Sequence, residues 1–416
     1  MPRTIHVIGA GLAGLSAAVK LAGRGERVAV HEAAGQAGGR CRSYHDPALD
    51  MEIDNGNHLL LSANYAAAGY LRTIGATNCL IGPPGADFAF VDLASGARWV
   101  LHINDGRLPW WIFRAGNRVP GTTALDYLPF ARLLRAAKDK TVCQTVSCAG
   151  PLYERLARPL FVAALNTDPQ EASARLAGAI VRETLFAGGK ACRPLIARAG
   201  LGAAFIEPAL KFLAQHNATV SFGHRLRAFD FAEGKISALD FGDDKIALEE
   251  GDAVILAVPP VVAAAIVPNL TTPTEFRAIV NAHFRIEPPP ALAPIVGVIN
   301  ATTEWLFAFP GRLSVTISAA DRLLDTPREE LAAKIWQEVA TVAGLPKALP
   351  PWQIVRERRA TFAATPEEDA KRPGAATAWS DLFLAGDWTQ TGLPATIEGA
   401  IRSGNRAAEL IGDGHR

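Results

Sequence analysis

The sequence predicts an α/β protein: a Rossmann-type parallel sheet assembled from separate stretches of the chain, together with a second, α+β domain. Two observations predict this fold. A strand–glycine turn–helix–strand unit fills residues 5–32, and a strand–Gly–Asp–helix unit fills residues 382–410. Both units place their loops at the carboxyl ends of parallel strands, so the 416-residue chain must leave the sheet and return to it.

The first unit carries glycines at the spacing of a dinucleotide-binding turn. Residues 5–8 are predicted to form a buried strand, and an Ala- and Leu-rich helix is expected over residues 12–24. Between them, Gly9 permits the tight turn, Gly11 lets the backbone approach a pyrophosphate, and Gly14 lets helix and strand pack closely.

The start of that helix and the end of the next strand complete the unit. The first-turn amides at Leu12 and Ala13 can bind phosphate oxygens. The second strand, residues 27–31, ends on Glu32. This position suits a carboxylate that accepts hydrogen bonds from ribose hydroxyls.

A pair of glycines and an arginine then distinguish between cofactors. An NAD domain would begin its next helix here. Gly38, Gly39 and Arg40 instead resemble the second signature of FAD-dependent amine oxidases and carotenoid desaturases. In that group the glycines bring backbone near the pyrophosphate, and the arginine neutralises phosphate charge. A surface turn with a solvated arginine is the alternative.

Composition limits the classes of function. With 42 basic and 41 acidic residues, the charge gives no case for nucleic-acid binding. The five cysteines lack Cys-x-x-Cys spacing, so we expect neither a disulfide framework nor a metal site, and a reducing cytoplasm fits. A strand this close to Met1 leaves no room for a signal peptide. The most apolar run, residues 253–268, is too short to cross a bilayer, but attachment to a membrane surface stays open.

The loop from Asp54 to His58 is the next candidate for the site. It has the sequence Asp-Asn-Gly-Asn-His, in which Gly56 can bring main chain against a planar ring. An Asx-type turn before a helix would use the same residues. Carotenoid-type desaturases carry a similar Gly-x-His beside the isoalloxazine, which implies that Asn55, Gly56 and His58 lie at the flavin.

The middle of the chain is predicted to form the second domain. Strands are expected at residues 88–91 and 98–102, and a mainly helical, unusually apolar region follows over residues 108–198, with one helix near residues 171–185. Its most aromatic segment is Trp110, Trp111, Ile112 and Phe113, with Arg114 and Arg118 behind. That composition suits an apolar pocket, a membrane interface or plain core packing.

Later strands are predicted to return to the nucleotide domain. They are expected at residues 218–222, 225–231, 235–241 and 253–258. In flavin oxidases of this type, the strand that here holds Leu226 would pass the adenine. An amphipathic helix is expected over residues 328–342.

The C-terminal unit is a buried strand that ends on Gly386 and Asp387. It resembles the C-terminal signature of the same flavoproteins, which implies that Asp387 bonds the ribityl chain or the pyrophosphate edge. The following helix starts around Ala395, Thr396 and Ile397, and this start would face flavin N1 and O2. An ordinary strand–turn–helix with a capping aspartate is the alternative.

These motifs divide the chain. We expect residues 1–78, 205–265 and 380–416 to form a discontinuous FAD-binding domain. Residues 79–204 and 266–379 should form the substrate-binding domain.

Longer strings around the motifs resemble the squalene-associated FAD-dependent desaturase family of bacterial hopanoid synthesis. They cover residues 31–44, 53–62, 163–167 and 385–400. The resemblance implies a C30 isoprenoid substrate: hydroxysqualene loses its allylic hydroxyl and receives a hydride from reduced FAD, giving squalene. Because such a substrate dissolves in lipid, we expect a cytoplasmic protein attached peripherally to the inner membrane.

Several mechanistic questions stay open in the sequence. Loss of hydroxide needs a proton donor, for which His58, alone or through a water, is the candidate, with Asp54 as a second catalytic residue. A histidine that only bonds a carbonyl is the alternative. An FAD-dependent polyene desaturase and a catalytically silent partner of a prenyl synthase are rival readings. No second glycine motif marks an NAD(P)H site, so a separate reductase or direct reduction by a nicotinamide are both open.

Overall fold

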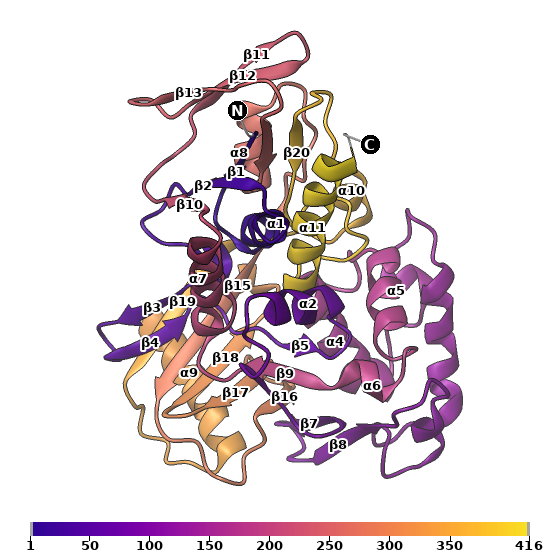
Figure 1. Ribbon diagram of the computed structural model, residues 1–416. Helices are drawn as coiled ribbons and strands as arrows, with labels where there is room; N and C mark the ends of the chain where they lie inside the picture. Colours follow the sequence, from indigo (N-terminus) through magenta and orange to yellow (C-terminus); the bar gives the residue numbers. More distant parts are fainter. Residues whose placement is uncertain (1–2, 414–416) are drawn as a thin grey trace.

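A computed structural model describes residues 3–413 and confirms the α/β class (Figure 1). A parallel sheet of five strands, in the order β10-β2-β1-β14-β20, forms the nucleotide part. Its strands are β1 (Thr4–Ile8), β2 (Arg27–His31), β10 (Thr219–Ser221), β14 (Ala253–Leu256) and β20 (Leu382–Leu384). Because β14 lies between β1 and β20, the two ends of the chain meet in one sheet.

These five strands come from three separate segments, as a discontinuous domain requires. The boundaries near residues 78, 205, 265 and 380 remain predictions. The first two and last three residues of the predicted domain lie outside the described residues.

Helices cover one face of this five-stranded sheet. A small three-stranded sheet and helix α8 cover the other face. On the first face, α1 (Leu12–Ala22) packs along α11 (Ile397–Asp413), beside α2 (Tyr65–Thr73) and α7 (Glu207–Gln215). A Cβ atom at Gly404 would lie 2.1 Å from the Ala13 carbonyl oxygen, so α11 can approach α1 only with glycine there. On the second face lie α8 (Pro260–Ile266) and an antiparallel sheet of β11 (Ala228–Ala232), β12 (Lys235–Asp240) and β13 (Lys245–Ala247).

The second large sheet has seven strands in the order β19-β15-β18-β17-β16-β7-β8, and only β7 and β16 run parallel. The strands are β7 (Ala86–Asp92), β8 (Arg98–Ile103), β15 (Phe276–Arg285), β16 (Ile295–Ile299), β17 (Trp305–Phe309), β18 (Arg312–Ile317) and β19 (Trp352–Phe362). The amphipathic helix α9 (Arg328–Ala343), predicted at residues 328–342, covers one face through Leu331, Ile335 and Val339. The β15 and β18 part of the other face receives Asn57, and the part from β17 to β8 packs against the helical region that contains Trp111 and Leu156.

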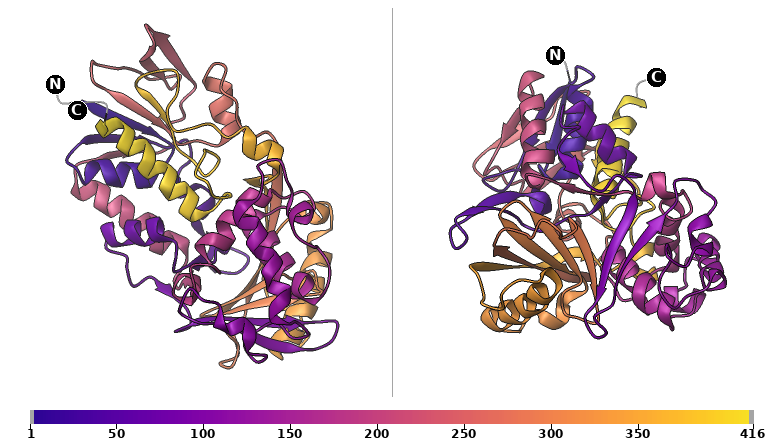
Figure 2. Two further views of the ribbon diagram at one scale, coloured as in Figure 1. Left: turned by 90° about the vertical axis from the view of Figure 1, so that its right-hand side faces the viewer. Right: turned by 90° about the horizontal axis from the view of Figure 1, so that it is seen from below.

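The remaining elements are shorter, and the helices between β8 and residue 194 form a lobe beside the seven-stranded sheet (Figure 2). The shorter elements are the hairpin β3 (Ser43–Asp46) and β4 (Met51–Asp54), the small sheet β5 (Leu60–Leu61), β9 (Pro194–Ala197) and β6 (Leu80–Ile81), and the helices α3 (Val142–Thr145), α4 (Arg158–Leu165), α5 (Ala174–Glu183), α6 (Gly189–Cys192) and α10 (Pro366–Ala370). Helix α5 confirms the helix predicted near residues 171–185.

The structure corrects three expectations. Residues 110–113 and 124–135 form 3-10 turns in place of longer α-helices, because Pro109 and Pro129 interrupt this stretch. The strand predicted at residues 225–231 is β11, which starts only at Ala228, so Leu226 precedes it. Cys143 and Cys148 form a disulfide, although no disulfide framework was expected; Cys143 lies in α3 and Cys148 three residues after its end, with Cα atoms 5.3 Å apart.

Candidate functional site

The glycine turn after β1 has two glycines fixed by packing and one that faces open space. A Cβ atom at Gly9 would lie 2.5 Å from the Ala257 oxygen, and one at Gly14 would lie 1.9 Å from the Gly9 oxygen. A Cβ atom at Gly11 would meet nothing within 4 Å. Packing within the chain therefore explains Gly9 and Gly14, whereas the space at Gly11 fits a bound pyrophosphate.

The second glycine motif lies directly against this turn. The Gly38 amide donates to the Ala10 oxygen at 2.8 Å, and Gly38 and Gly39 both have positive φ, of 109° and 54°. A Cβ atom at Gly39 would lie 3.5 Å from the Gly11 Cα, so the backbones of the two motifs adjoin. Helix α1 begins at Leu12, and the amides of Leu12 and Ala13 therefore lie in a first turn that lacks intrahelical acceptors.

Glu32 follows β2 and braces the same turn. One carboxylate oxygen accepts from the Ala10 amide at 2.7 Å and the other from the Ala34 amide at 2.8 Å. The half-buried carboxylate has further lone pairs, so it fits a role as acceptor for ribose hydroxyls.

Arg40 joins the N-terminal motifs to the C-terminal one. Its Nη2 donates to Asp387 Oδ1 at 2.7 Å, and its Nη1 donates to the Ala360 oxygen at 2.6 Å. The nearby Asp387 carboxylate raises the pKa of the Arg40 guanidinium. Asp387 is buried, while the Arg40 side chain keeps 44% of its surface exposed, so the arginine can also meet a ligand phosphate.

Arg372, which the sequence analysis did not identify, holds the loop after β20. Its Nη2 donates to the Asp387 carbonyl at 3.0 Å, to Thr391 Oγ1 at 2.8 Å and to the Thr389 carbonyl, and its Nη1 pairs with Asp369 at 3.1 Å. Burial lowers the pKa of this guanidinium. Arg372 thereby fixes the backbone that presents Asp387.

The start of α11 follows that loop. Thr396 Oγ1 accepts from the Gly399 amide at 3.0 Å and so caps the helix. Ala395 and Thr396 are half-buried and Ile397 is buried, and the first-turn amides are available to a polar ligand atom.

Leu226 lies on the opposite face of the sheet from α11. It belongs to an apolar cluster with Ile8 and Leu256, the last residues of β1 and β14. This position is close to the glycine turn, and contact of Leu226 with an adenine stays a prediction.

Asp54 anchors the Asp54–His58 loop. Its Oδ1 accepts from Ser43 Oγ at 2.6 Å and from the Leu201 amide at 2.8 Å, and its Oδ2 lies 3.7 Å from Arg312. These partners use the carboxylate within the chain. The geometry therefore favours positioning over proton transfer as the role of Asp54.

The loop then lies on the seven-stranded sheet. Asn55 Nδ2 donates to Glu357 at 3.3 Å, and the Asn57 amide donates to Asn281 Oδ1 at 3.3 Å. Asn57 Nδ2 donates to Thr316 Oγ1 at 3.2 Å. A Cβ atom at Gly56 would lie 3.2 Å from Asn281 Nδ2, so this glycine allows close contact with β15.

His58 lies among the charged groups of the cofactor motifs. Asp54, Arg40 and Asp387 act on it electrostatically, and burial, the largest effect, lowers its pKa to about 4. Its neighbour Leu59 packs against the aromatic cluster of β7, β16 and β17. The imidazole is therefore neutral near pH 7, and the next residue in the chain, Leu59, contacts the apolar cluster.

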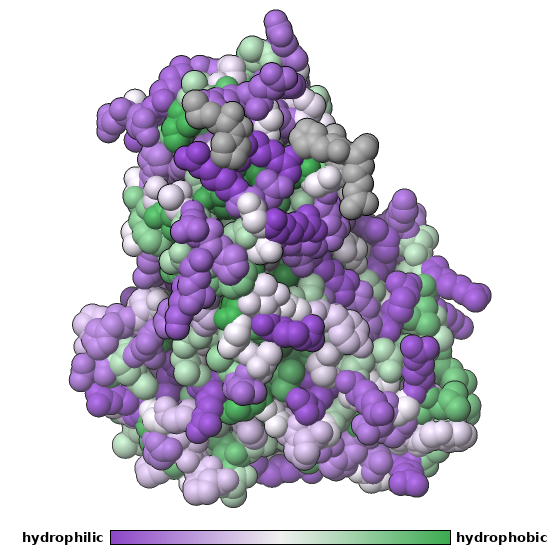
Figure 3. All heavy atoms as spheres, viewed as in Figure 1, coloured by the Kyte–Doolittle hydropathy of each residue, from purple (hydrophilic) through white to green (hydrophobic). Residues whose placement is uncertain are grey.

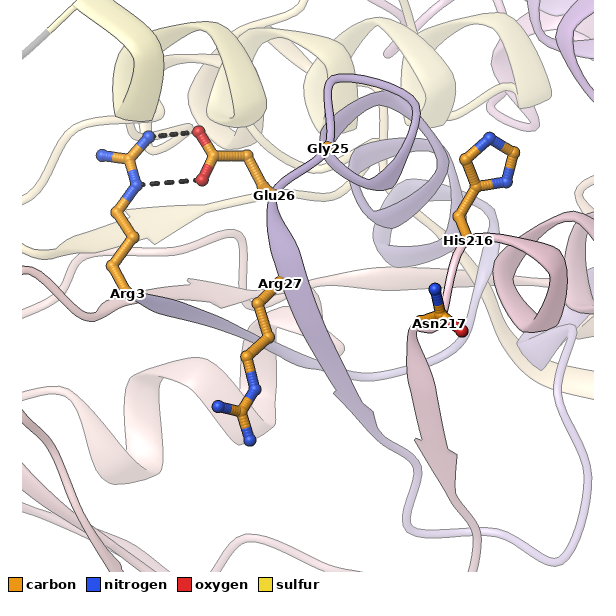
Figure 4. A pocket seen from close by; sticks show the side chains of 6 residues that line it. All are labelled: Arg3, Gly25, Glu26, Arg27, His216 and Asn217. Carbon is orange, nitrogen blue, oxygen red and sulfur yellow. Dashed lines mark hydrogen bonds and ion pairs between the residues drawn. The ribbon is translucent and has the colours of Figure 1, made fainter. Parts of the chain in front are cut away.

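A cavity of about 530 Å³ lies at the amino ends of β1, β2 and β10, at the opposite ends of these strands from the glycine motifs. Figure 4 shows that its charged side chains diverge: Arg3 pairs with Glu26 on one side, and Arg27 points to the other. This arrangement offers no convergent site, so the candidate site stays at the glycine motifs.

Comparisons with known proteins agree with this geometry. The family model of flavin-containing amine oxidoreductases matches residues 12–412. The chain is 60% identical to a hydroxysqualene dehydroxylase of Rhodopseudomonas palustris, over 99% of each chain, and 47% identical to one of Zymomonas mobilis, over 97% of this chain and 98% of that one. Cyclohexylamine oxidase from Brevibacterium oxydans has a similar fold, with a TM-score of 0.70 at 16% identity over the whole of both chains. A putrescine oxidase variant gives 0.71 at 15% identity over 99% of each.

Two glycine substitutions should separate packing from cofactor binding. Gly11→Ala adds a methyl group where the structure leaves space, so we expect the apoprotein to keep its thermal midpoint while FAD affinity falls at least about tenfold. Gly14→Ala forces a contact with the Gly9 oxygen and should destabilise the apoprotein by about 1–3 kcal/mol. Thermal denaturation and FAD titration measure the two effects.

Gly116→Ala is the matched control, because a Cβ atom there meets nothing within 4 Å. Normal FAD affinity in Gly11→Ala would contradict the placement of the pyrophosphate.

Proposed function

The chain belongs to the flavin-containing amine oxidoreductase family, and we propose that within it the protein is an FAD-dependent hydroxysqualene dehydroxylase that reduces hydroxysqualene to squalene. Identity of 47–60% over nearly the full chain to three proteins of that name supports the substrate and the reaction. The observation that carries the proposal is that His58 lies among the charged groups of the cofactor motifs while the next residue, Leu59, packs on an apolar face.

The two faces of the seven-stranded sheet are packed differently. On the α9 face most core side chains, including Phe284, Leu313 and Trp336, are fully buried. On the other face the side chains of the aromatic cluster are also buried, at most 9% exposed, and pack against Trp111, Leu152 and Leu156 of the helical region. This apolar face borders the Asp54–His58 loop through Leu59, and through Phe309, whose ring centroid lies 4.7 Å from the Arg312 guanidinium. We propose that it receives the isoprenoid chain.

Different residues of the cofactor motifs would bind different parts of FAD. Gly11, Gly39 and Arg40 would face the pyrophosphate, with the amides of Leu12 and Ala13; Glu32 would bind the ribose, and Asp387 the ribityl side. Gly56 and the start of α11 would lie near the ring. When bound and reduced, FAD supplies a hydride, which with one proton replaces the hydroxyl and releases water.

The remaining residues prepare the substrate. The apolar face excludes water, so an allylic cation can persist long enough to be reduced. Because His58 is neutral, we propose that it positions the leaving hydroxyl, or a water that protonates it, and Asp54 holds the loop.

The proposal extends to the membrane and to the electron source. Every helix within residues 3–413 is too short or too polar to cross a bilayer. Trp110 and Phe113 are 61% and 62% exposed, and Leu125 and Leu128 are similarly exposed nearby, whereas Trp111 and Ile112 are buried. Figure 3 shows hydrophobic side chains at the right-hand edge, over the segment between β8 and α5. We propose peripheral attachment of a cytoplasmic protein to the inner membrane there, with electrons from NAD(P)H or a separate reductase.

The activity is tested by anaerobic turnover. Holoenzyme reduced with dithionite and mixed with hydroxysqualene should form squalene. The amount of squalene should equal the amount of flavin that becomes oxidised, as measured from its absorbance spectrum. NADH and NADPH, supplied in place of dithionite, test direct reduction by a nicotinamide. If the oxidised protein instead converts squalene into a more unsaturated product, the protein is a desaturase and the proposed dehydroxylase activity is wrong.

Substitution of His58 tests its role. His58→Ala should lower turnover by roughly 3–10-fold with FAD content unchanged, the range of one neutral hydrogen bond, and His58→Gln should retain more activity, since an amide also positions a hydroxyl. A loss of about 10²–10⁴-fold would instead indicate general acid catalysis by His58. With its pKa lowered to about 4, the ring does not titrate between pH 6 and pH 8, so kcat should be flat there. A fall in kcat above pH 6.5 that His58→Gln abolishes would show a protonated donor.

The exposed aromatic residues predict membrane binding. Trp110→Glu with Phe113→Glu should lower binding to anionic liposomes by roughly tenfold or more, because burial of one large apolar side chain contributes about 1.5–3 kcal/mol. Val261→Glu, at an exposed position of α8, is the control for added charge. Equal binding by the double variant and the control would place attachment elsewhere.

A further inference from the structure

Two buried polar atoms beside the His58 loop have no hydrogen-bond partner among the described residues. One is Oδ1 of Asn57, an acceptor, and the other is Nε1 of Trp305, a donor. Asn57 is 7% exposed and Trp305 is 6% exposed. Buried polar groups are normally paired, and a missing partner is costly, so each atom points to a ligand or a water.

Asn57 and Trp305 are both adjacent to a third residue, Thr316. Asn57 Nδ2 donates to Thr316 Oγ1 at 3.2 Å. Thr316 on β18 is the cross-strand partner of Trp305 on β17, and directly opposed residues of an antiparallel pair point to the same face with Cβ atoms about 4.5–5.5 Å apart. The side chains of Asn57 and Trp305 therefore both adjoin Thr316, and Asn57 directly precedes His58 in the chain.

Trp305 also stands at the border of the apolar face. Its ring makes an edge contact with Phe90, with centroids 5.8 Å apart, and Phe90 stacks on Trp99. An isoprenoid chain lying along these rings would reach Trp305 and Asn57 at the end nearest His58.

We propose that Asn57 and Trp305 bind the hydroxyl of the substrate, as positioning residues for the reaction. A hydroxyl is at once a donor and an acceptor. It can donate to Asn57 Oδ1 and accept from the Trp305 indole N–H, which satisfies both atoms. The pair holds the carbon–oxygen bond beside His58 and distinguishes the alcohol from the hydrocarbon product. This inference rests on the proposed function and adds the recognition of the hydroxyl.

Trp305→Phe tests the donor while it keeps an aromatic ring. Binding of hydroxysqualene and of squalene to oxidised holoenzyme, in the same detergent micelles, is followed by the flavin absorbance. The wild type should prefer the alcohol by roughly 3–10-fold, the range of a neutral hydrogen bond, and Trp305→Phe should lose this preference with squalene affinity unchanged. Its KM for hydroxysqualene should rise accordingly.

Trp336→Phe is the matched control. Trp336 also has an unpartnered indole nitrogen within the described residues, but it lies on the α9 face of the same sheet, so its substitution should leave the preference intact. Asn57→Leu removes the acceptor and should lose the same preference. Because one hydroxyl joins both residues, the double variant should lose no more than either single one.

The outcomes are distinguishable. A wild type that converts hydroxysqualene, with a Trp305→Phe variant that keeps the full preference, overturns this inference and leaves the proposed function standing. Additive losses in the double variant also overturn it, since the two residues would then bind separate groups. Failure of the wild type to convert hydroxysqualene overturns the proposed function itself.

Discussion

The contact between Arg40 and Asp387 is the constraint on which the arrangement of the chain depends. The two residues are 347 positions apart, and the carboxylate is buried beside the guanidinium at 2.7 Å. A buried carboxylate without a cation is costly, so the loop after β20 that carries Asp387 must approach the 3-10 turn after β2 that carries Arg40. The intervening chain has to leave and return, which it does through β14 between β1 and β20. Arg372 completes the constraint because it holds the backbone of Asp387.

The face of the seven-stranded sheet opposite α9 has a polar part and an aromatic part. Toward β15 and β18 the face is polar, and Asn281 and Thr316 receive the Asp54–His58 loop. Toward β17, β16 and β7 it is aromatic, with Phe307 and Phe90 among its residues. The polar part fixes the loop through hydrogen bonds, and the aromatic part offers an apolar surface beside it. His58 stands at the boundary, and this position explains why burial dominates its pKa.

The sequence predicted the local units well because their causes are local. The turn at Gly9 and the helix after Gly386 follow from steric and periodic patterns within about thirty residues. Arg372, Asn281 and Thr316 were missed because each acts on a loop far away in sequence, and no spacing rule marks such a residue. Burial of Ile112 beside exposed Trp110 was equally hidden, since a 3-10 turn, and not a regular helix, decides which side chains face inward.

The charges at the site favour capture of a hydride by an allylic cation over loss of a proton from the carbon next to it. Each carboxylate near His58 is engaged by an arginine, Asp387 by Arg40 and Asp54 by Arg312. Neither is free to capture an allylic cation or to remove a proton from its neighbouring carbon. A neutral imidazole with a pKa of about 4 is also a weak base. A cation formed on the apolar face beside such groups is best quenched by hydride, and this supports squalene over a more unsaturated polyene as the product.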